Sequence, residues 1–138
     1  MKTKHYLTLA DAEMLMDAAI EYATERQFKV SIAIVDDGGA LLHMKRMQGA
    51  SALTAGFCLE KAKAAAAGRK ATKSFEDSIR NGQMGLLTVE TLGGMLEGGE
   101  AILYQGECVG AMGVSGVKAV EDAEIAQFAI AKFLEQQS

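Results

Sequence analysis

The segment spanning residues 97–126 constrains the fold more than any other, because glycines recur in it wherever a chain would have to turn; it reads EGGEAILYQGECVGAMGVSGVKAVEDAEIA. Apolar residues at 101–104 and 107–114 flank Gln105-Gly106, a two-residue turn of the kind that closes a β-hairpin. A helical pattern begins at about Ala119. The segment is therefore predicted to be a hairpin that passes directly into the last helix.

The sequence of the N-terminal half predicts a helix, another hairpin and a second helix. Thr8 is placed to cap an amphipathic helix, in which apolar residues recur at helical spacing. A short apolar run at 30–35 and a loosely alternating stretch at 41–47 flank Asp37-Gly38-Gly39, and these three residues tolerate a positive φ. The stretch 50–67 is unusually rich in alanine. Because its side chains are small, we expect this helix to lie close against a sheet or another helix.

Two further segments are less regular. A short helix is expected at 74–80, whereas 85–94 has no clean period. The last helix is apolar on most of its circumference. A helix on the surface of a monomer needs only one apolar stripe, so the excess predicts burial on two sides or contact with another subunit.

Composition limits the class of protein. The 138 residues are about one domain long, so 1–138 is predicted to be a single domain. The net charge of −4 argues against a nucleic-acid partner, because phosphate binding needs a basic surface. No apolar run reaches about 18 residues, so we expect no membrane span. Asp11 and Glu13 come before any apolar h-region can develop, so we expect no signal peptide. Cys58 and Cys108 form no CxxC motif, which fits a cytoplasmic location where thiols are reduced.

Arg46 and Lys61 are candidates for binding an anionic group. Arg46 ends a predicted strand, and Lys61 lies inside the alanine-rich helix. If the two converge, they form a small cationic site for a carboxylate or propionate; ordinary ion pairing of each is the alternative. His43, in a predicted strand, is a candidate ligand or acid/base group, although an isolated histidine is more often a surface or hydrogen-bonded residue.

The motif Gly113-Val114-Ser115-Gly116 invites comparison with the nucleophile elbow of serine hydrolases, but Val117 stands where that motif needs a glycine. We interpret the glycines as backbone architecture for a tight strand-to-helix connection and Ser115 as a cap or turn residue. Paired carboxylates at 97/100 and 121/124 are interpreted as surface or helix-start charges. No metal site is predicted.

Taken together, the motifs of this chain resemble those of the GlcG/HbpS family, which includes the C-terminal domain of PduO-type proteins. Each motif alone is weak, whereas the combination is specific and covers nearly the whole chain. The matching motifs are Val35-Asp36-Asp37-Gly38-Gly39, Arg46-Met47, Gly49-Ala50, Lys61-Ala62, Gly98-Gly99, Gly106, Val109-Gly110-Ala111, Gly113-Val114-Ser115-Gly116, and Glu121-Asp122 with Ile125-Ala126.

The resemblance implies an α/β (α+β) fold of profilin-like type, with a five-stranded antiparallel sheet, packed helices and symmetric homo-oligomers. Some members bind haem, so haem is the cofactor that the resemblance suggests. The expected ligand-binding residues are Arg46, Met47, Lys61, Gly98, Gly99 and His43.

These observations favour a cytoplasmic, oligomeric binding protein for haem or another anionic small ligand, accessory to a catabolic pathway. Two alternatives remain at this stage. One is an enzyme of small-molecule catabolism that uses the same pocket, with Lys61 or His43 as acid/base group. The other is a structural accessory subunit.

Overall fold

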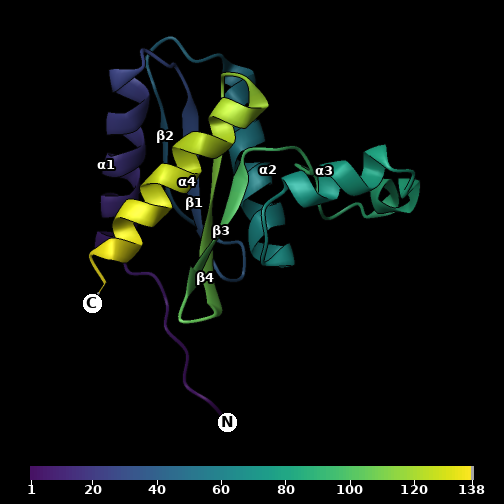
Figure 1. The fold of residues 1–138 in the computed structure, drawn as a ribbon, viewed down its shortest axis with the longest axis horizontal. Coiled ribbons are helices and arrows are strands. Elements are labelled where there is room, and N and C mark those ends of the chain that lie inside the picture. Colours follow the sequence, from purple (N-terminus) through teal and green to yellow (C-terminus); the bar gives the residue numbers. More distant parts are fainter. Residues whose placement is uncertain (138) are drawn as a thin grey trace.

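The computed structural model describes residues 1–137 and shows an antiparallel sheet with helices on both faces (Figure 1). The strands are β1 (Ser31–Asp36), β2 (Leu41–Arg46), β3 (Gly99–Tyr104) and β4 (Glu107–Ser115), in the spatial order β2-β1-β4-β3. The long helices are α1 (Leu9–Glu25), α2 (Ala52–Gly68) and α4 (Ala119–Glu135). Helices α1 and α4 cover one face of the sheet, and α2 covers the other. Among the described residues, no helix combines the length and apolarity needed to cross a bilayer.

The α+β class is confirmed, but the described residues form four strands where the resemblance implied five. Each of the two hairpins supplies two strands. The chain that precedes β3 runs against α2 and does not extend the sheet: a Cβ added to Gly94 would lie 2.6 Å from the amide nitrogen of Lys61. The expectation of a fifth strand was therefore wrong, because this stretch packs on a helix instead of pairing with a strand.

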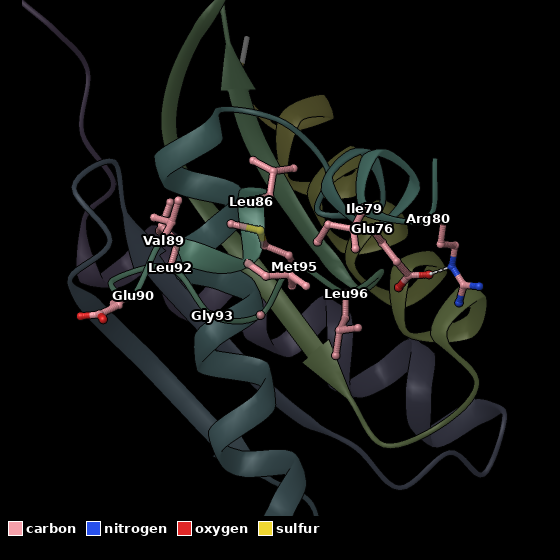
Figure 2. Close-up of a pocket in the computed structure, with 12 residues that line it drawn as sticks. Glu76, Ile79, Arg80, Leu86, Val89, Glu90, Leu92, Gly93, Met95 and Leu96 are labelled. Atoms are coloured by element: carbon pink, nitrogen blue, oxygen red, sulfur yellow. Dashed lines mark hydrogen bonds and ion pairs between the residues drawn. The ribbon is translucent and has the colours of Figure 1, made fainter. Parts of the chain in front are cut away.

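A separate group of elements lies beside α2, away from the sheet (Figures 1 and 2). It consists of α3 (Lys73–Arg80), the 3₁₀ helix η1 (Met84–Thr88) and the chain that leads towards β3. We call residues 73–96 the side lobe. The short helix expected at 74–80 is confirmed, and the stretch without a clean period is the part that contains η1.

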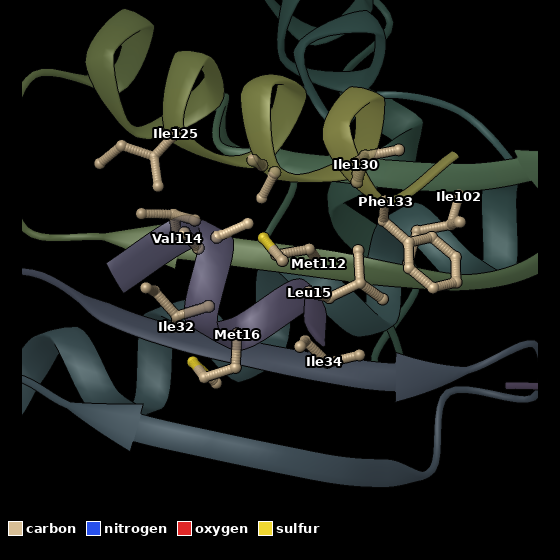
Figure 3. Close-up of a cluster of buried hydrophobic side chains, with 14 of the residues drawn as sticks. Leu15, Met16, Ile32, Ile34, Ile102, Met112, Val114, Ile125, Ile130 and Phe133 are labelled. Atoms are coloured by element: carbon tan, nitrogen blue, oxygen red, sulfur yellow. The ribbon is translucent and has the colours of Figure 1, made fainter. Parts of the chain in front are cut away.

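Strand β1 is buried on both faces, because it lies inside the sheet between β2 and β4. Its unbroken apolar run is typical of such a strand. Ile32 and Ile34 point into the layer below α1 and α4 (Figure 3). Ala33 and Val35 point the other way, towards α2. The two faces thus differ in side-chain size, with large residues facing two helices and small ones facing one.

Helix α2 approaches the sheet closely because small residues face each other across the contact. Ala62 and Ala65 of α2 pack against Ala33 and Ala111 of the sheet. A Cβ added to Gly113 of β4 would lie only 2.6 Å from the amide nitrogen of Ala62 and 3.1 Å from its Cβ. The main chains of α2 and β4 are therefore nearly in contact at this point.

We predict that Gly113→Ala lowers the free energy of unfolding by at least about 2 kcal/mol, because the new methyl group would force α2 and β4 apart. Gly56 is the matched control: it lies in α2, and a Cβ there would meet no atom within 4 Å. Gly56→Ala should stabilise the protein by about 0.5–1 kcal/mol, the usual gain in a helix. Urea denaturation of the two variants checks both values, and equal effects would contradict the close approach.

Helix α4 is apolar on most sides because it is buried on two sides within the chain. One side packs on the sheet through Ile125, Ala129 and Phe133. Another side packs on α1, where the rings of Phe128 and Tyr22 lie 4.7 Å apart between centroids. Burial on two sides, the first of the two explanations expected from the sequence, thus accounts for most of the apolar surface of α4.

Ser115 is not the cap of α4, so that expectation was wrong. It is the last residue of β4, pairs with Ser31 of β1 and is 5% exposed. The helix begins after Lys118, whose amide donates a hydrogen bond to Glu121 Oε1 at 3.2 Å. Gly116 makes the turn between them with a φ of 147°, which few other residues adopt. The strand stays paired one residue longer than the sequence pattern indicated.

Candidate functional site

A buried ion pair joins the two helical layers of the molecule. The Nζ of Lys61, on α2, donates hydrogen bonds to the carbonyl oxygen of Val114 at 2.9 Å and to Oδ2 of Asp122, on α4, at 3.2 Å. The side chains of Lys61 and Asp122 are 5% and 3% exposed. The amide of Val117 donates to the second carboxylate oxygen of Asp122 at 3.1 Å. Every polar atom of the pair is therefore used inside the protein.

Gly98 and Gly99 leave the space that this ion pair occupies. A Cβ on Gly98, whose φ is 128°, would lie 2.7 Å from the Nζ of Lys61 and 3.1 Å from the Cβ of Asp122. A Cβ on Gly99 would lie 2.7 Å from Cγ2 of Thr72, whose Oγ1 accepts a hydrogen bond from the Gly99 amide at 2.9 Å. The structure thus brings three of the expected site residues together, Lys61 with the glycine pair, as a packed and internally bonded cluster.

Burial raises the pKa of Asp122 to about 6, from an ordinary value of 3.8. The loss of water around the carboxyl group is the largest cause. The charge of Lys61 and the hydrogen bond from the Val117 amide act in the opposite direction, and the nearby charge of Glu121 adds a small further increase. Near neutral pH the group is ionised and paired, and it takes up a proton in mildly acidic solution.

We predict that the free energy of unfolding gains a contribution from Asp122 as the pH falls from about 6 to 4. In that window the folded protein binds a proton that the unfolded chain, with a carboxyl pKa of 3.8, does not yet bind. The free energy of unfolding of wild type, relative to that of Asp122→Asn, should therefore rise by up to about 1.4 kcal/mol for each unit by which the pH falls. Chemical denaturation at pH 4, 5, 6 and 7 measures it.

Asp17→Asn is the control for this experiment, because Asp17 lies exposed on α1. The pH dependence assigned to Asp122 is the difference between the results for the two variants. If the stability of wild type relative to Asp122→Asn stays constant or decreases as the pH falls, the raised pKa of Asp122 is contradicted.

Arg46 and Met47 lie at a second place, at the end of β2. They line a shallow hollow of about 270 Å³ together with residues 48–50. The Nε of Arg46 donates to the carbonyl oxygen of Ala50 at 2.9 Å, while Lys61 is bonded to Val114 and Asp122. The described residues give Arg46 and Lys61 no common partner, so their joint binding of one anion stays a hypothesis.

His43 lies on β2, at the edge of the sheet, and pairs with Ile34 of β1. Its side chain is partly exposed. The six expected site residues therefore lie in three places: the cluster around Lys61, the hollow at Arg46 and Met47, and His43 on the edge strand.

A large apolar hollow lies in the side lobe and has a volume of about 570 Å³ (Figure 2). Its walls are mainly aliphatic. The apolar lining residues are Ile79, Leu86, Leu87, Val89, Leu92, Met95 and Leu96, with Gly93 and Gly94. Three charged residues, Glu76, Arg80 and Glu90, complete the lining. We call this hollow the aliphatic pocket.

Glu76 links the wall of the aliphatic pocket to the start of β3. Its Oε2 accepts a hydrogen bond from Nε of Arg80 at 3.2 Å, and its Oε1 accepts one from the amide of Glu97 at 3.0 Å. The sequence interpretation missed this pocket. The available signal was an apolar stretch, 84–96, that fits neither a helical nor a strand pattern and so has no obvious partner to bury it.

Comparison with known proteins decides the family. The family model described as "Haem degrading protein HbpS-like" matches residues 7–131. The chain belongs to the HbpS-like family. Protein GlcG of Escherichia coli strain K12 is 40% identical over 115 residues, which is 83% of this chain and 85% of GlcG. The resemblance stated from the motifs is thereby confirmed.

Two solved structures show the same fold. The crystal structure of Klebsiella pneumoniae protein ORFY has a TM-score of 0.90 at 30% identity and covers 96% of this chain and 94% of its own. The crystal structure of a complex of PduOC with haem has a TM-score of 0.81 at 33% identity, with 92% and 94% covered. The fold is thus shared with a protein whose structure contains haem.

Proposed function

We propose that this chain is a binding protein for a small apolar ligand and that the aliphatic pocket is its binding site, with haem as the first ligand to test. The observation that carries the proposal is the pocket itself, a hollow of about 570 Å³ with predominantly aliphatic walls. Ligand pockets commonly have volumes of roughly 300–1,000 Å³ and apolar walls with a few polar groups.

The residues of the pocket support binding more than catalysis. Its twelve lining residues include no serine, cysteine, histidine, lysine or tyrosine, which are the usual nucleophiles and proton carriers. Two carboxylates and one guanidinium are present, and two of these three groups, Glu76 and Arg80, are bonded to each other. The pocket can therefore hold an apolar body and offers little for bond making or breaking.

Haem fits this pocket in part. The aliphatic walls suit the face of a porphyrin ring, and the guanidinium of Arg80 suits a propionate. The thioether of Met95 is of a type that ligates haem iron. The complex of the PduOC relative with haem supports the choice of this ligand.

A competing site for an anionic ligand is the hollow at Arg46 and Met47. Its volume of about 270 Å³ suits a small carboxylate better than a porphyrin. The guanidinium of Arg46 supplies the charge there. We also propose that the chain is an accessory protein of a catabolic pathway in the cytoplasm.

We predict that added haemin shifts its Soret band on binding and saturates at a fixed stoichiometry. Leu87→Asp should weaken binding by at least about tenfold, because a carboxylate in an aliphatic wall opposes an apolar ring. Leu9→Asp is the matched control: Leu9 is 62% exposed on α1 and Leu87 is 61% exposed, but only Leu87 lines the pocket. Absorbance titration of wild type and both variants measures the effect.

The same titration tests the competing site. If Arg46→Gln weakens binding while Leu87→Asp leaves it unchanged, the ligand binds at the Arg46 hollow and the aliphatic pocket is not the site. If haemin causes no saturable change in wild type, haem is not the ligand.

We also propose that the chain forms a homo-oligomer through the outer side of α2, where Leu53 and Phe57 lie one turn apart and are 64% and 42% exposed. Phe57→Glu should dissociate the assembly. Phe128→Glu is the matched control, because Phe128 is 43% exposed but already packs on Tyr22 within the chain. Light scattering measures the molar mass of wild type and of both variants. A monomeric wild type would refute the assembly, and dissociation by Phe128→Glu alone would move the interface to α4.

A further inference from the structure

We propose that the aliphatic pocket recognises a tetrapyrrole by its ring and its carboxylate edge and not by its metal, so that the metal-free porphyrin binds as tightly as haem. This inference rests on the proposed function, since it concerns the ligand of the same pocket. It goes beyond that function because it names which part of the ligand the chain recognises.

The lining of the pocket lacks a strong iron ligand. Proteins hold haem iron with imidazole, thiolate or phenolate groups, or with a methionine that acts beside a histidine. Of the twelve lining residues, only Met95 carries a side chain of any of these types. A thioether without a histidine is a weak ligand for ferric iron, so the iron would add little to the free energy of binding.

The stronger iron ligands of this chain lie on other elements. His43 is on the edge strand β2, and His5 packs against the ring of Tyr104 at 4.9 Å between centroids. Cys58 is buried between α2 and the sheet, and burial raises the pKa of its thiol to about 11, so it stays protonated near neutral pH. Cys108 lies in β4. The pocket is therefore separated from these groups by the packing of the fold.

The charges around the pocket match a ligand with carboxylates on one edge. Arg80 lies at one side of the pocket beside Glu76, and the carboxylate of Glu90 lies at the opposite side (Figure 2). Arg80 uses Nε to bond Glu76, and its terminal nitrogens have no partner among the described residues. A carboxylate is thus favoured next to Arg80 and disfavoured next to Glu90. A porphyrin with both propionates on one edge meets this arrangement.

The test compares protoporphyrin IX with haemin on the same protein, by porphyrin fluorescence and Soret absorbance. We expect the two dissociation constants to agree within about threefold. Met95→Leu, which keeps the apolar volume, should change both constants by the same factor and leave the ferric Soret position unchanged. Arg80→Gln should weaken both ligands by about tenfold through loss of a charge-assisted hydrogen bond. Lys73→Gln is the control, because Lys73 forms a similar ion pair on α3, with Asp77 at 2.7 Å, but does not line the pocket.

Three results would overturn the inference while leaving haem binding intact. Haemin that binds more than about tenfold tighter than protoporphyrin, with the advantage lost in Met95→Leu, would make Met95 an axial ligand. The same advantage lost in His43→Ala would place the iron at β2. Equal effects of Arg80→Gln and Lys73→Gln would remove the carboxylate contact. Saturable binding of neither porphyrin would instead refute the proposed function, and the inference with it.

Discussion

The ion pair between Lys61 and Asp122 is the interaction on which the arrangement of layers depends. It connects α2 on one face of the sheet to α4 on the other, next to the carbonyl oxygen of Val114. A buried ion pair adds little net stability by itself, because both charges lose their water. Removal of one partner is costly, however, since it leaves a charge buried and unpaired. The pair therefore acts mainly as a constraint on where the two helices can lie.

The glycines follow from this constraint. Gly98 must lack a side chain because Lys61 occupies the space where its Cβ would stand, and Gly113 must lack one because α2 approaches the main chain of β4 there. The alanine-rich face of α2 has the same origin. Small residues thus allow one helix to cover its face of the sheet closely, while two helices cover the opposite face with larger side chains.

The proposed binding site lies outside these constrained layers. The side lobe contributes all the lining residues of the aliphatic pocket. The lobe contacts the layered part of the fold where Gly94 lies against the main chain of α2 at Glu60. The hydrogen bond that the Glu97 amide donates to Glu76 fixes the lobe to the start of β3. The residues of the proposed binding site and those of the core thus lie in different parts of the fold.

The sequence by itself determined the two hairpins, the long helices, the close packing of α2 and the family, because periodicity, turn glycines and small residues are local properties of the chain. It also named Lys61 and the Gly98-Gly99 pair as ligand-binding residues, and that role stays a prediction. Only the tertiary structure decided that Lys61 bonds Asp122, that Arg46 bonds Ala50 elsewhere, and that the apolar residues of the side lobe surround a pocket. These facts depend on which distant segments meet, and the spacing of residues along one segment carries no information about the partner on another.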